Sequence, residues 1–145
     1  MTGMSGTGKS TLLRELATRG WTAVDTDYDG WTRPDGTWDE TRLTALLDTT
    51  PGDLAVAGTV ENQGSFYRRF DQVVLLSAPL DVLLDRVRRR PDNPYGRTGE
   101  QRAEIAGYLA GVEPLLRAGA DVELDGRLPV GELADAVERL PTRPR

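Results

Sequence analysis

The stretch Gly3-Met4-Ser5-Gly6-Thr7-Gly8-Lys9-Ser10-Thr11 fits the pattern G-x-x-x-x-G-K-[ST] at every fixed position. This pattern defines a P-loop, in which glycines let the backbone curl until several N–H groups converge on the phosphates of a nucleotide. The helix expected after the loop directs the positive end of its dipole at the same anion. The sequence therefore predicts a nucleotide-binding site at the start of the chain.

Within this motif, Lys9 is expected to reach the β- and γ-phosphates, and the hydroxyl of Ser10 to coordinate the Mg²⁺ ion that bridges them. Lys9 is also the only lysine among the eighteen Lys and Arg residues of the chain. Because Arg does not replace Lys at such a site, this exception falls where phosphate binding needs a compact ammonium group. The other residues predicted to contact the nucleotide are Gly3, Ser5, Gly6, Thr7, Gly8 and Thr11.

Composition narrows the class of protein further. A chain of 145 residues has the size of one domain. Its net charge of −5 argues against a general nucleic-acid-binding surface. No apolar run reaches the ~18 residues of a membrane span, so we expect a cytoplasmic protein, monomeric or dimeric. The absence of Cys and His excludes disulfides, thiol nucleophiles, His-based catalysis and the usual zinc sites.

The order of predicted elements indicates the fold class. Hydrophobic periodicity and turn signals predict helices and strands that alternate along the chain. This alternation is typical of an α/β protein, here a P-loop NTPase three-layer fold with a parallel sheet, over residues 1–145 as one domain. The predicted helices span 10–19, 39–47, 79–90, 100–116 (bent near Pro114) and 129–140, the predicted strands span 21–24, 54–57, 73–76 and 121–124, and 61–70 is a helix or a loop and helix.

One expected strand has no counterpart in the sequence. A P-loop ordinarily follows a buried parallel strand of about five residues, whereas only Met1 and Thr2 precede Gly3. We hypothesise that the sequence starts inside the natural reading frame and that the first strand of the sheet is missing.

Acidic residues after the strand at 21–24 point to the chemistry. Asp25 and Asp27 come at the carboxyl end of this strand, where open α/β sheets bind ligands. Neither of the next two apolar strands ends in an acid, which disfavours motor-type and transport ATPases. The Asn-Lys-x-Asp signature of guanine-nucleotide binding is absent too, since Lys9 is the only lysine. Small-molecule kinases remain, with Asp25 in the metal shell and Asp27 beside the acceptor hydroxyl; the alternative is that both are ordinary turn acids.

An arginine-rich segment forms the predicted lid at about residues 88–99. It joins the basic end of the helix at 79–90 to a Pro- and Gly-containing loop that cannot be helical in its middle. Arg90 and Arg97 are the candidates for contacting the transferred phosphoryl group. The alternative for each arginine near position 90 is a solvated helix end beside its negative dipole. Arg86, one turn earlier, is a candidate for stacking on adenine.

Together, Gly3 to Thr11, Val24-Asp25-Thr26-Asp27 and the loop from Arg88 to Arg97 resemble shikimate kinase and its relatives among nucleoside and nucleotide kinases. This resemblance implies ATP and Mg²⁺ as cofactors, a metal-shell role for Asp25 and a substrate-hydroxyl contact for Asp27. It also implies that the loop at 125–127, with Arg127, flanks the base. Residues 25–31 and 93–97 are similar to small bacterial ATP-binding, kinase-like proteins as well.

The chain departs from the shikimate kinase pattern in two places. The glycine triplet expected after the third strand is reduced to Ala57-Gly58-Thr59, and the arginines that clamp a substrate carboxylate have no secure counterparts. The function predicted is therefore ATP- and Mg²⁺-dependent phosphoryl transfer to a small hydroxylated metabolite or nucleoside-like acceptor. The rival functions are a nucleotide-binding sensor without transfer activity and a nucleotide hydrolase. Acceptor-pocket candidates, with core or turn positions as the alternative, are Tyr28, Trp31, Arg33 and Arg68.

Overall fold

Two pairs of parallel strands form the centre of the protein. The computed structural model describes residues 1–91 and 94–143. β1 (Thr22–Asp25) pairs in parallel with β2 (Leu54–Ala57), and β3 (Val74–Ser77) pairs in parallel with β4 (Val122–Asp125). Each strand follows a helix or loop that returns the chain to the same end, as parallel pairing requires. The predicted parallel α/β architecture is confirmed.

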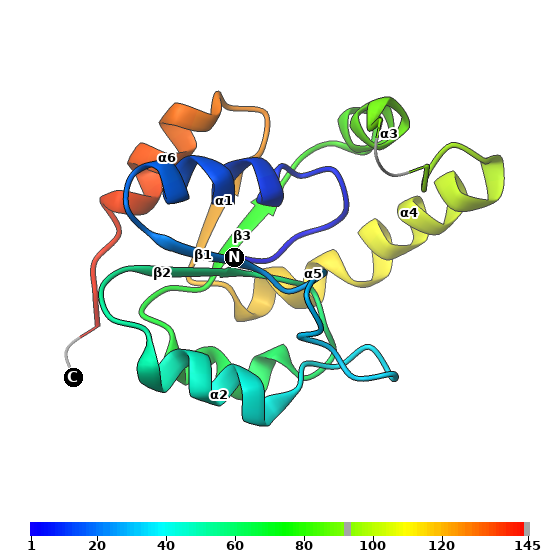
Figure 1. Cartoon of the computed structure of the whole chain (residues 1–145). Helices are drawn as coiled ribbons and strands as arrows, with labels where there is room; N and C mark the ends of the chain where they lie inside the picture. The colour runs from blue at the N-terminus through cyan, green and yellow to red at the C-terminus, as the bar shows by residue number, and fades with distance from the viewer. Residues whose placement is uncertain (92–93, 144–145) are drawn as a thin grey trace.

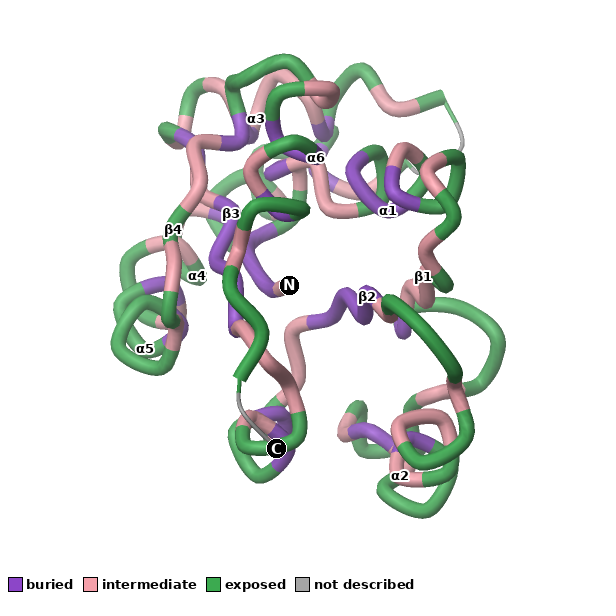
Figure 2. The backbone as a smooth tube through the Cα atoms, turned by 90° about the vertical axis from the view of Figure 1, so that its left-hand side faces the viewer, coloured by how far each residue is buried: buried purple, intermediate pink, exposed green. Residues whose placement is uncertain are grey.

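The first residues of the chain join the two pairs. Thr2 lies beside β3, where its N–H donates to Val74 O at 2.8 Å and its carbonyl accepts from Leu76 N–H at 2.9 Å. On the other side, Gly58 N–H donates to Met1 O at 3.2 Å. In Figure 2 the N-terminus accordingly lies between β2 and β3. Residues 1–3 thus occupy the central position where the predicted first strand belongs, with a single ladder bridge.

Helices cover both faces of these strands. In Figure 1, α1 (Lys9–Thr18) and α6 (Val130–Glu138) lie on one face, and α2 (Glu40–Thr49) lies on the other. α3 (Leu80–Arg89) and α4 (Gly99–Gly111) extend to one side, next to the P-loop. This arrangement gives the three layers predicted from the alternating elements.

Apolar residues at helical spacing explain how α1 packs. Leu12 and Leu16 are fully buried and lie one turn apart, so they share the face that meets the strands. They join a cluster with Leu76 of β3 and Leu133 of α6. The P-loop immediately before α1 is therefore anchored to the centre of the protein by its own helix.

Two predicted helices differ from the structure. The helix predicted over 100–116 is two helices, α4 and α5 (Glu113–Gly119), because Pro114 sits in the first turn of α5 and has no N–H to continue α4. The segment predicted at 61–70 is a 3₁₀ helix, Gln63–Arg69. Asp92 and Asn93 of the predicted lid lie outside the described residues.

A cavity of about 720 Å³ opens beside Met1. Residues of β2 and β3, among them Val56 and Val74, line it together with Phe70, so it lies between the two strand pairs. The Met1 α-amino group donates to Val56 O at 2.6 Å at this point. The cavity therefore adjoins the buried start of the described chain.

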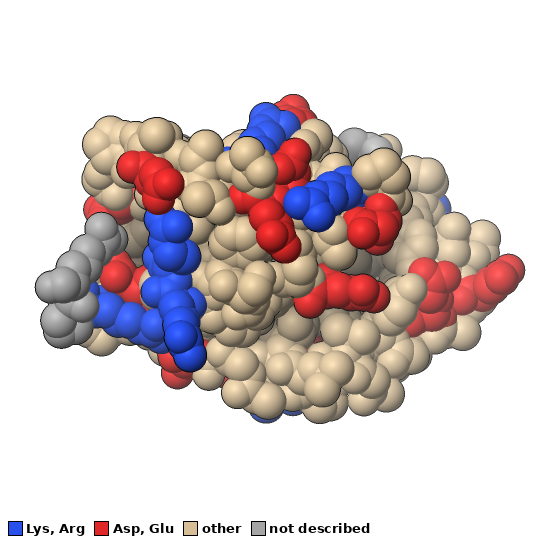
Figure 3. Space-filling model, turned by 90° about the horizontal axis from the view of Figure 1, so that it is seen from below, with Lys and Arg blue, Asp and Glu red and all other residues tan. Residues whose placement is uncertain are grey.

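Charged side chains on the surface and the length of the helices are the two features that bear on binding to nucleic acids or membranes. The face in Figure 3 is largely uncharged, with one group of adjoining basic side chains toward the left and mainly acidic groups over the rest. Among the helices of the described residues, none combines the length and the apolar character needed to cross a bilayer.

Candidate nucleotide-binding and phosphoryl-transfer site

The P-loop forms a tight turn between residues 1–3 and α1. Gly6 and Gly8 have φ angles of 88° and 102°, values that side chains with a Cβ rarely adopt. At Gly3 a Cβ would lie 2.3 Å from the carbonyl oxygen of Leu76, so the loop passes directly against β3. Gly8 precedes the first residue of α1, and no side chain caps the N–H groups there. These groups are free to bind an anion.

Lys9 lies folded over its own loop. Its Nζ donates to the carbonyl oxygens of Gly3 and Met4. Burial lowers the pKa of Lys9 to about 8, although the charges of Asp27 and Asp25 act to raise it. A phosphate group in the loop would give this ammonium a stronger partner than the two carbonyls.

Ser10 and Asp25 meet next to the loop. The Ser10 hydroxyl donates to Asp25 Oδ2 at 2.7 Å, and Asp25 Oδ1 accepts from the backbone N–H of Asp27 at 3.1 Å. A hydroxyl and a carboxylate are the oxygen ligands that Mg²⁺ prefers, and Mg²⁺ bound with a nucleotide needs few protein ligands because phosphates and waters supply the others. The described residues hold no group of three or more His, Cys, Asp or Glu arranged for a metal. The donor set fits a nucleotide-bound Mg²⁺ rather than a protein-enclosed metal.

Asp27 faces the same space. Loss of hydration and the nearby charge of Asp25 raise its pKa, while Lys9 and Arg90 act to lower it. Two carboxylates and two cations therefore lie close enough to affect one another. This is the kind of perturbed cluster found at catalytic sites.

A cavity of about 880 Å³ brings the predicted groups together. It runs from the P-loop past α1 and β1 to the end of α3. Of the predicted site residues, those that line it are Ser5, Gly6, Gly8, Lys9, Ser10, Thr11, Asp25, Asp27, Arg86 and Arg90, together with the acceptor candidate Tyr28. Gly3 and Thr7 do not line it; the Thr7 hydroxyl instead donates to Met4 O at 3.0 Å inside the loop.

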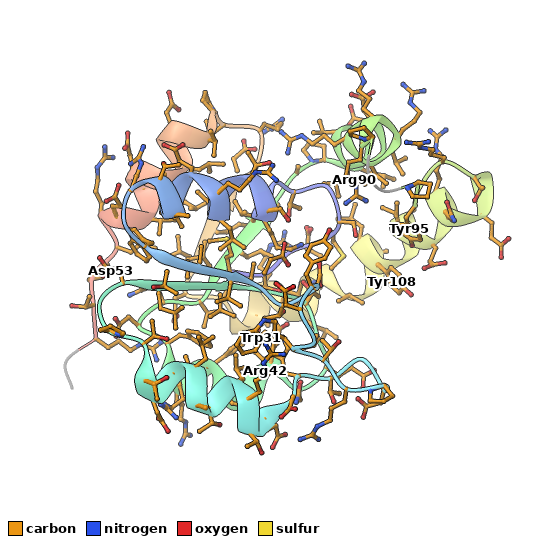
Figure 4. The ribbon with its side chains drawn as sticks, in the orientation of Figure 1. Trp31, Arg42, Asp53, Arg90, Tyr95 and Tyr108 are labelled. Carbon is orange, nitrogen blue, oxygen red and sulfur yellow. The ribbon has the colours of Figure 1, made fainter. Side chains whose placement is uncertain are left out.

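The lid arginines occupy different environments. Arg90 lines the cavity, and its Nε is buried without a hydrogen-bond partner among the described residues. Figure 4 shows Arg90 where α3 ends, on the side of the molecule away from Trp31. Arg97 does not line the cavity, and its guanidinium donates to the carbonyl of Arg90 at 2.6 Å. Of these two arginines, Arg90 is therefore the one that faces the cavity.

Arg86 lines the cavity and also contacts the P-loop backbone. Its NH1 lies 3.2 Å from Gly6 O, and its NH2 donates to Gly126 O at 2.8 Å. Arg127 does not line the cavity, and its guanidinium pairs with the Asp125 carboxylate at 2.8 Å. The adenine contacts predicted for both arginines stay predictions; in this structure Arg86 joins two loops and Arg127 forms a local ion pair.

Of the other acceptor-pocket candidates, none lines the cavity. Arg33 and Arg68 are exposed. Trp31 carries the guanidinium of Arg42 over its ring at 4.1 Å, and the two side chains lie together near the start of α2 (Figure 4). Sequence reasoning missed Arg14, which lines the cavity one turn after Ser10 and was detectable by its helical spacing.

Sequence and structure comparisons agree with this geometry. Residues 1–107 match the AAA domain family. The chain is 32% identical to a shikimate kinase of Nitrobacter winogradskyi over 146 aligned positions, covering 88% of this chain and 68% of that protein. It is 31% identical to a shikimate kinase of Bradyrhizobium diazoefficiens, covering 88% of this chain and 70% of that protein.

Solved structures show the same fold. Shikimate kinase from Acinetobacter baumannii, in complex with shikimate, superposes with a TM-score of 0.71 at 23% identity and covers 95% of this chain and 88% of its own. Shikimate kinase from Bacteroides thetaiotaomicron superposes with a TM-score of 0.70 at 18% identity and covers 94% of this chain and 93% of its own. The fold and site define a P-loop protein of the α/β class. The chain belongs to the AAA domain family and is a shikimate-kinase-like P-loop kinase.

Proposed function

We propose that this protein transfers the γ-phosphoryl group of ATP to a hydroxyl of a small metabolite or nucleoside-like acceptor. The observation that carries the proposal is that Asp27, Lys9 and the Ser10–Asp25 pair face one cavity. A carboxylate beside a phosphate-binding loop is what phosphoryl transfer to a hydroxyl requires, because the reaction depends on positioning and charge neutralisation.

The P-loop and Lys9 bind the phosphates. The free N–H groups at the start of α1 and the Lys9 ammonium neutralise charge on the β- and γ-phosphates. Ser10 and Asp25 would hold Mg²⁺, which supplies further neutralisation when bound. Arg86 keeps the loop in shape through its bonds to Gly6 O and Gly126 O.

Asp27 acts on the acceptor. Its carboxylate orients the hydroxyl and accepts the hydroxyl proton as the acceptor oxygen forms its bond to the γ-phosphorus. The bond from the γ-phosphorus to the β–γ bridging oxygen breaks, and ADP leaves. The raised pKa of Asp27 favours receipt of this proton.

Arg90 is the arginine proposed to stabilise charge on the transferred group. It lines the cavity and influences the pKa values of both Lys9 and Asp27. An arginine in this role is worth about 10³-fold or more in related phosphoryl transfers. Arg97 would reach the site only after leaving the carbonyl of Arg90, so we propose for it a role in the closed state of the lid.

A screen for ATP consumption tests the proposal. Wild-type protein is assayed with sugars, nucleosides, polyols and shikimate-like acids, with Asp27→Asn as the blank. We expect at least one acceptor to be phosphorylated, with kcat about 10²–10⁴-fold lower in Asp27→Asn and unchanged affinity for ATP. Asp29→Asn removes an equal charge from the exposed part of the same loop and should keep wild-type turnover.

Two other outcomes identify the rival functions. ATP binding without any phosphorylated acceptor, and indifference to Asp27→Asn, would indicate a sensor. Phosphate release that needs no acceptor and survives in Asp27→Asn would indicate a hydrolase. Either result contradicts the kinase proposal.

A further inference from the structure

Trp38 lies directly behind the candidate catalytic carboxylates. Its side chain is 4% exposed, and its indole Nε1 donates to the hydroxyl oxygen of Thr26 at 2.8 Å. Thr26 separates Asp25 from Asp27 in the sequence. A buried aromatic side chain, twelve positions from Thr26 along the chain, is thus hydrogen-bonded to the turn that carries both acids.

Thr26 is in turn hydrogen-bonded to Ala57, the last residue of β2. Its hydroxyl donates to Ala57 O at 2.8 Å, and its backbone N–H donates to the same carbonyl at 2.9 Å. The side chain is 1% exposed, so water does not compete for these bonds. The hydroxyl therefore has one acceptor and one donor partner, which fixes the rotation of the Thr26 side chain.

Gly58 packs closely against both Thr26 and Trp38. A Cβ at this position would lie 2.3 Å from the Thr26 hydroxyl oxygen and 3.1 Å from the Trp38 ring. The space beside Gly58 is consequently filled by the indole and the threonine. The turn at residues 25–27 cannot relax in that direction without displacing the ring.

The indole is itself held in place. Asn62 Oδ1 accepts from the Trp38 backbone N–H at 2.9 Å, and Asn62 Nδ2 donates to the Trp38 carbonyl at 3.1 Å. Phe66 meets the ring edge-on, with centroids 5.8 Å apart. Contacts from the 3₁₀ helix thus fix the backbone and the ring of Trp38 together.

We propose that Trp38 is a positioning residue that orients Asp25 and Asp27 through its hydrogen bond to Thr26. The consequence for catalytic rate rests on the proposed kinase function, whereas the anchoring itself does not. Neither Trp38 nor Thr26 lines the nucleotide cavity, so both act through the acids rather than on the substrate.

The test compares variants that remove a hydrogen-bonding group; Thr26→Val keeps the size of the side chain, whereas Trp38→Phe also removes one ring of the buried indole. Trp38→Phe removes the indole N–H, Thr26→Val removes the hydroxyl, and Thr26→Ser keeps the hydroxyl. Trp21→Phe, in the separate cluster around α1, is the control for loss of an indole at a partly buried site. All are assayed well below their unfolding temperatures.

We expect Trp38→Phe and Thr26→Val each to lower kcat by about tenfold or more, since small misplacement of reacting groups has large effects on rate. The KM for ATP should stay within about twofold because the P-loop is untouched. Thr26→Ser should restore most of the rate. The double variant should lose no more than Thr26→Val alone, because Thr26→Val already removes the bond from Trp38 together with the bond to Ala57 O.

Hydrogen exchange of the Thr26 amide supplies a readout that needs no acceptor. In Trp38→Phe this amide should exchange faster than in wild type and in Trp21→Phe. The inference is overturned if the exchange rate or kcat of the variants is unchanged. It is also overturned if the losses in the double variant are additive, or if the KM for ATP rises by the same factor by which kcat falls. If wild-type protein phosphorylates no acceptor, the kinase proposal fails, and the exchange measurement alone decides whether Trp38 anchors the turn.

Discussion

Ser10 and Asp25, fifteen residues apart in the chain, are joined by a 2.7 Å hydrogen bond between the first turn of α1 and the last residue of β1. α1 places the hydroxyl and β1 places the carboxylate, and the packing of α1 on the strands holds them at this distance. The pair links the P-loop to the part of the cavity that Asp27, two residues further on, also lines.

The first prediction concerns metal dependence. Asp25→Asn removes the negative charge of the proposed Mg²⁺ shell while keeping the shape of the side chain. We expect the affinity for ATP measured with Mg²⁺ to fall by about 10–100-fold, and the affinity measured with EDTA to change little. Titration calorimetry under both conditions provides the comparison, with Asp29→Asn as the charge-matched control. Equal losses with and without Mg²⁺ would rule out a metal role for Asp25.

The second prediction is a pH dependence set by Lys9. Its pKa of about 8 in the free protein is low because the group is buried, and a bound phosphate favours the charged form. ATP affinity should therefore fall as the pH rises above about 8, by at most tenfold per pH unit. Lys9→Met should bind ATP weakly and without this fall. Wild-type affinity that is constant from about pH 7.5 to 9.5 would contradict the assignment.

The same pKa has a consequence for stability with the opposite sign. Lys9 titrates near 8 in the folded state and near its ordinary value of 10.5 in the unfolded chain. Between these values the unfolded state binds more protons, so the contribution of Lys9 to the free energy of unfolding rises with pH in this range. Comparison of urea denaturation of wild type and Lys9→Met at pH 7.5 and 9.5 isolates this contribution.

The third prediction concerns the contact between the P-loop and the loop after β4. A Cβ at Gly126 would lie 2.4 Å from Thr7 O and 3.2 Å from Ser77 O, both of them backbone atoms. Gly126→Ala should therefore displace the P-loop, weaken ATP binding and destabilise the protein by about 1–3 kcal/mol. Gly107→Ala, which has open space around it in α4, should instead stabilise by about 0.5–1 kcal/mol. Thermal unfolding and ATP titration of both variants test the contrast. Unchanged ATP affinity in Gly126→Ala would show that close packing of Gly126 on the P-loop is not needed for ATP binding.

The fourth prediction concerns the cavity beside Met1. An added segment of about four apolar β-branched residues before Met1 could pair with both β2 and β3 and fill part of the 720 Å³. It would also replace a buried α-amino group, whose pKa burial and Lys9 lower to about 5, by a peptide N–H. We expect a higher unfolding temperature than in the unextended chain. A Gly-Ser extension of equal length is the control, and equal melting of the two extended proteins would count against strand formation.

Local patterns were sufficient for most of the elements. The apolar spacing of Leu12, Leu13 and Leu16 agrees with the helix predicted at 10–19. The helix predicted from residue 39 forms as α2, capped by Asp39, whose side chain accepts from Arg42 N–H. Pro114 marked a bend, but only the structure shows that its missing N–H separates two helices. Each of these features depends on neighbours within one or two turns, which is why the sequence contains the necessary information.

The candidate site was predictable as far as its residues belong to one motif. Lys9, Ser10, Asp25 and Asp27 come from two short stretches whose spacing follows from the chemistry of phosphate and Mg²⁺ binding. The environments of Arg86, Arg97 and Arg127 were not predictable. A long arginine side chain reaches carbonyls and carboxylates that are remote in sequence, and its partner depends on how the loops pack.

The sequence by itself determined the phosphate-binding loop, the alternation of helices and strands, and the acids at the end of β1, because each is encoded in a local pattern of residue types and spacing. Only the tertiary structure decided that residues 1–3 lie between β2 and β3, and that Trp38 reaches Thr26 behind the two acids. Both relationships join segments distant along the chain. They arise from burial and from the pairing of buried hydrogen-bonding groups, which depend on the whole fold.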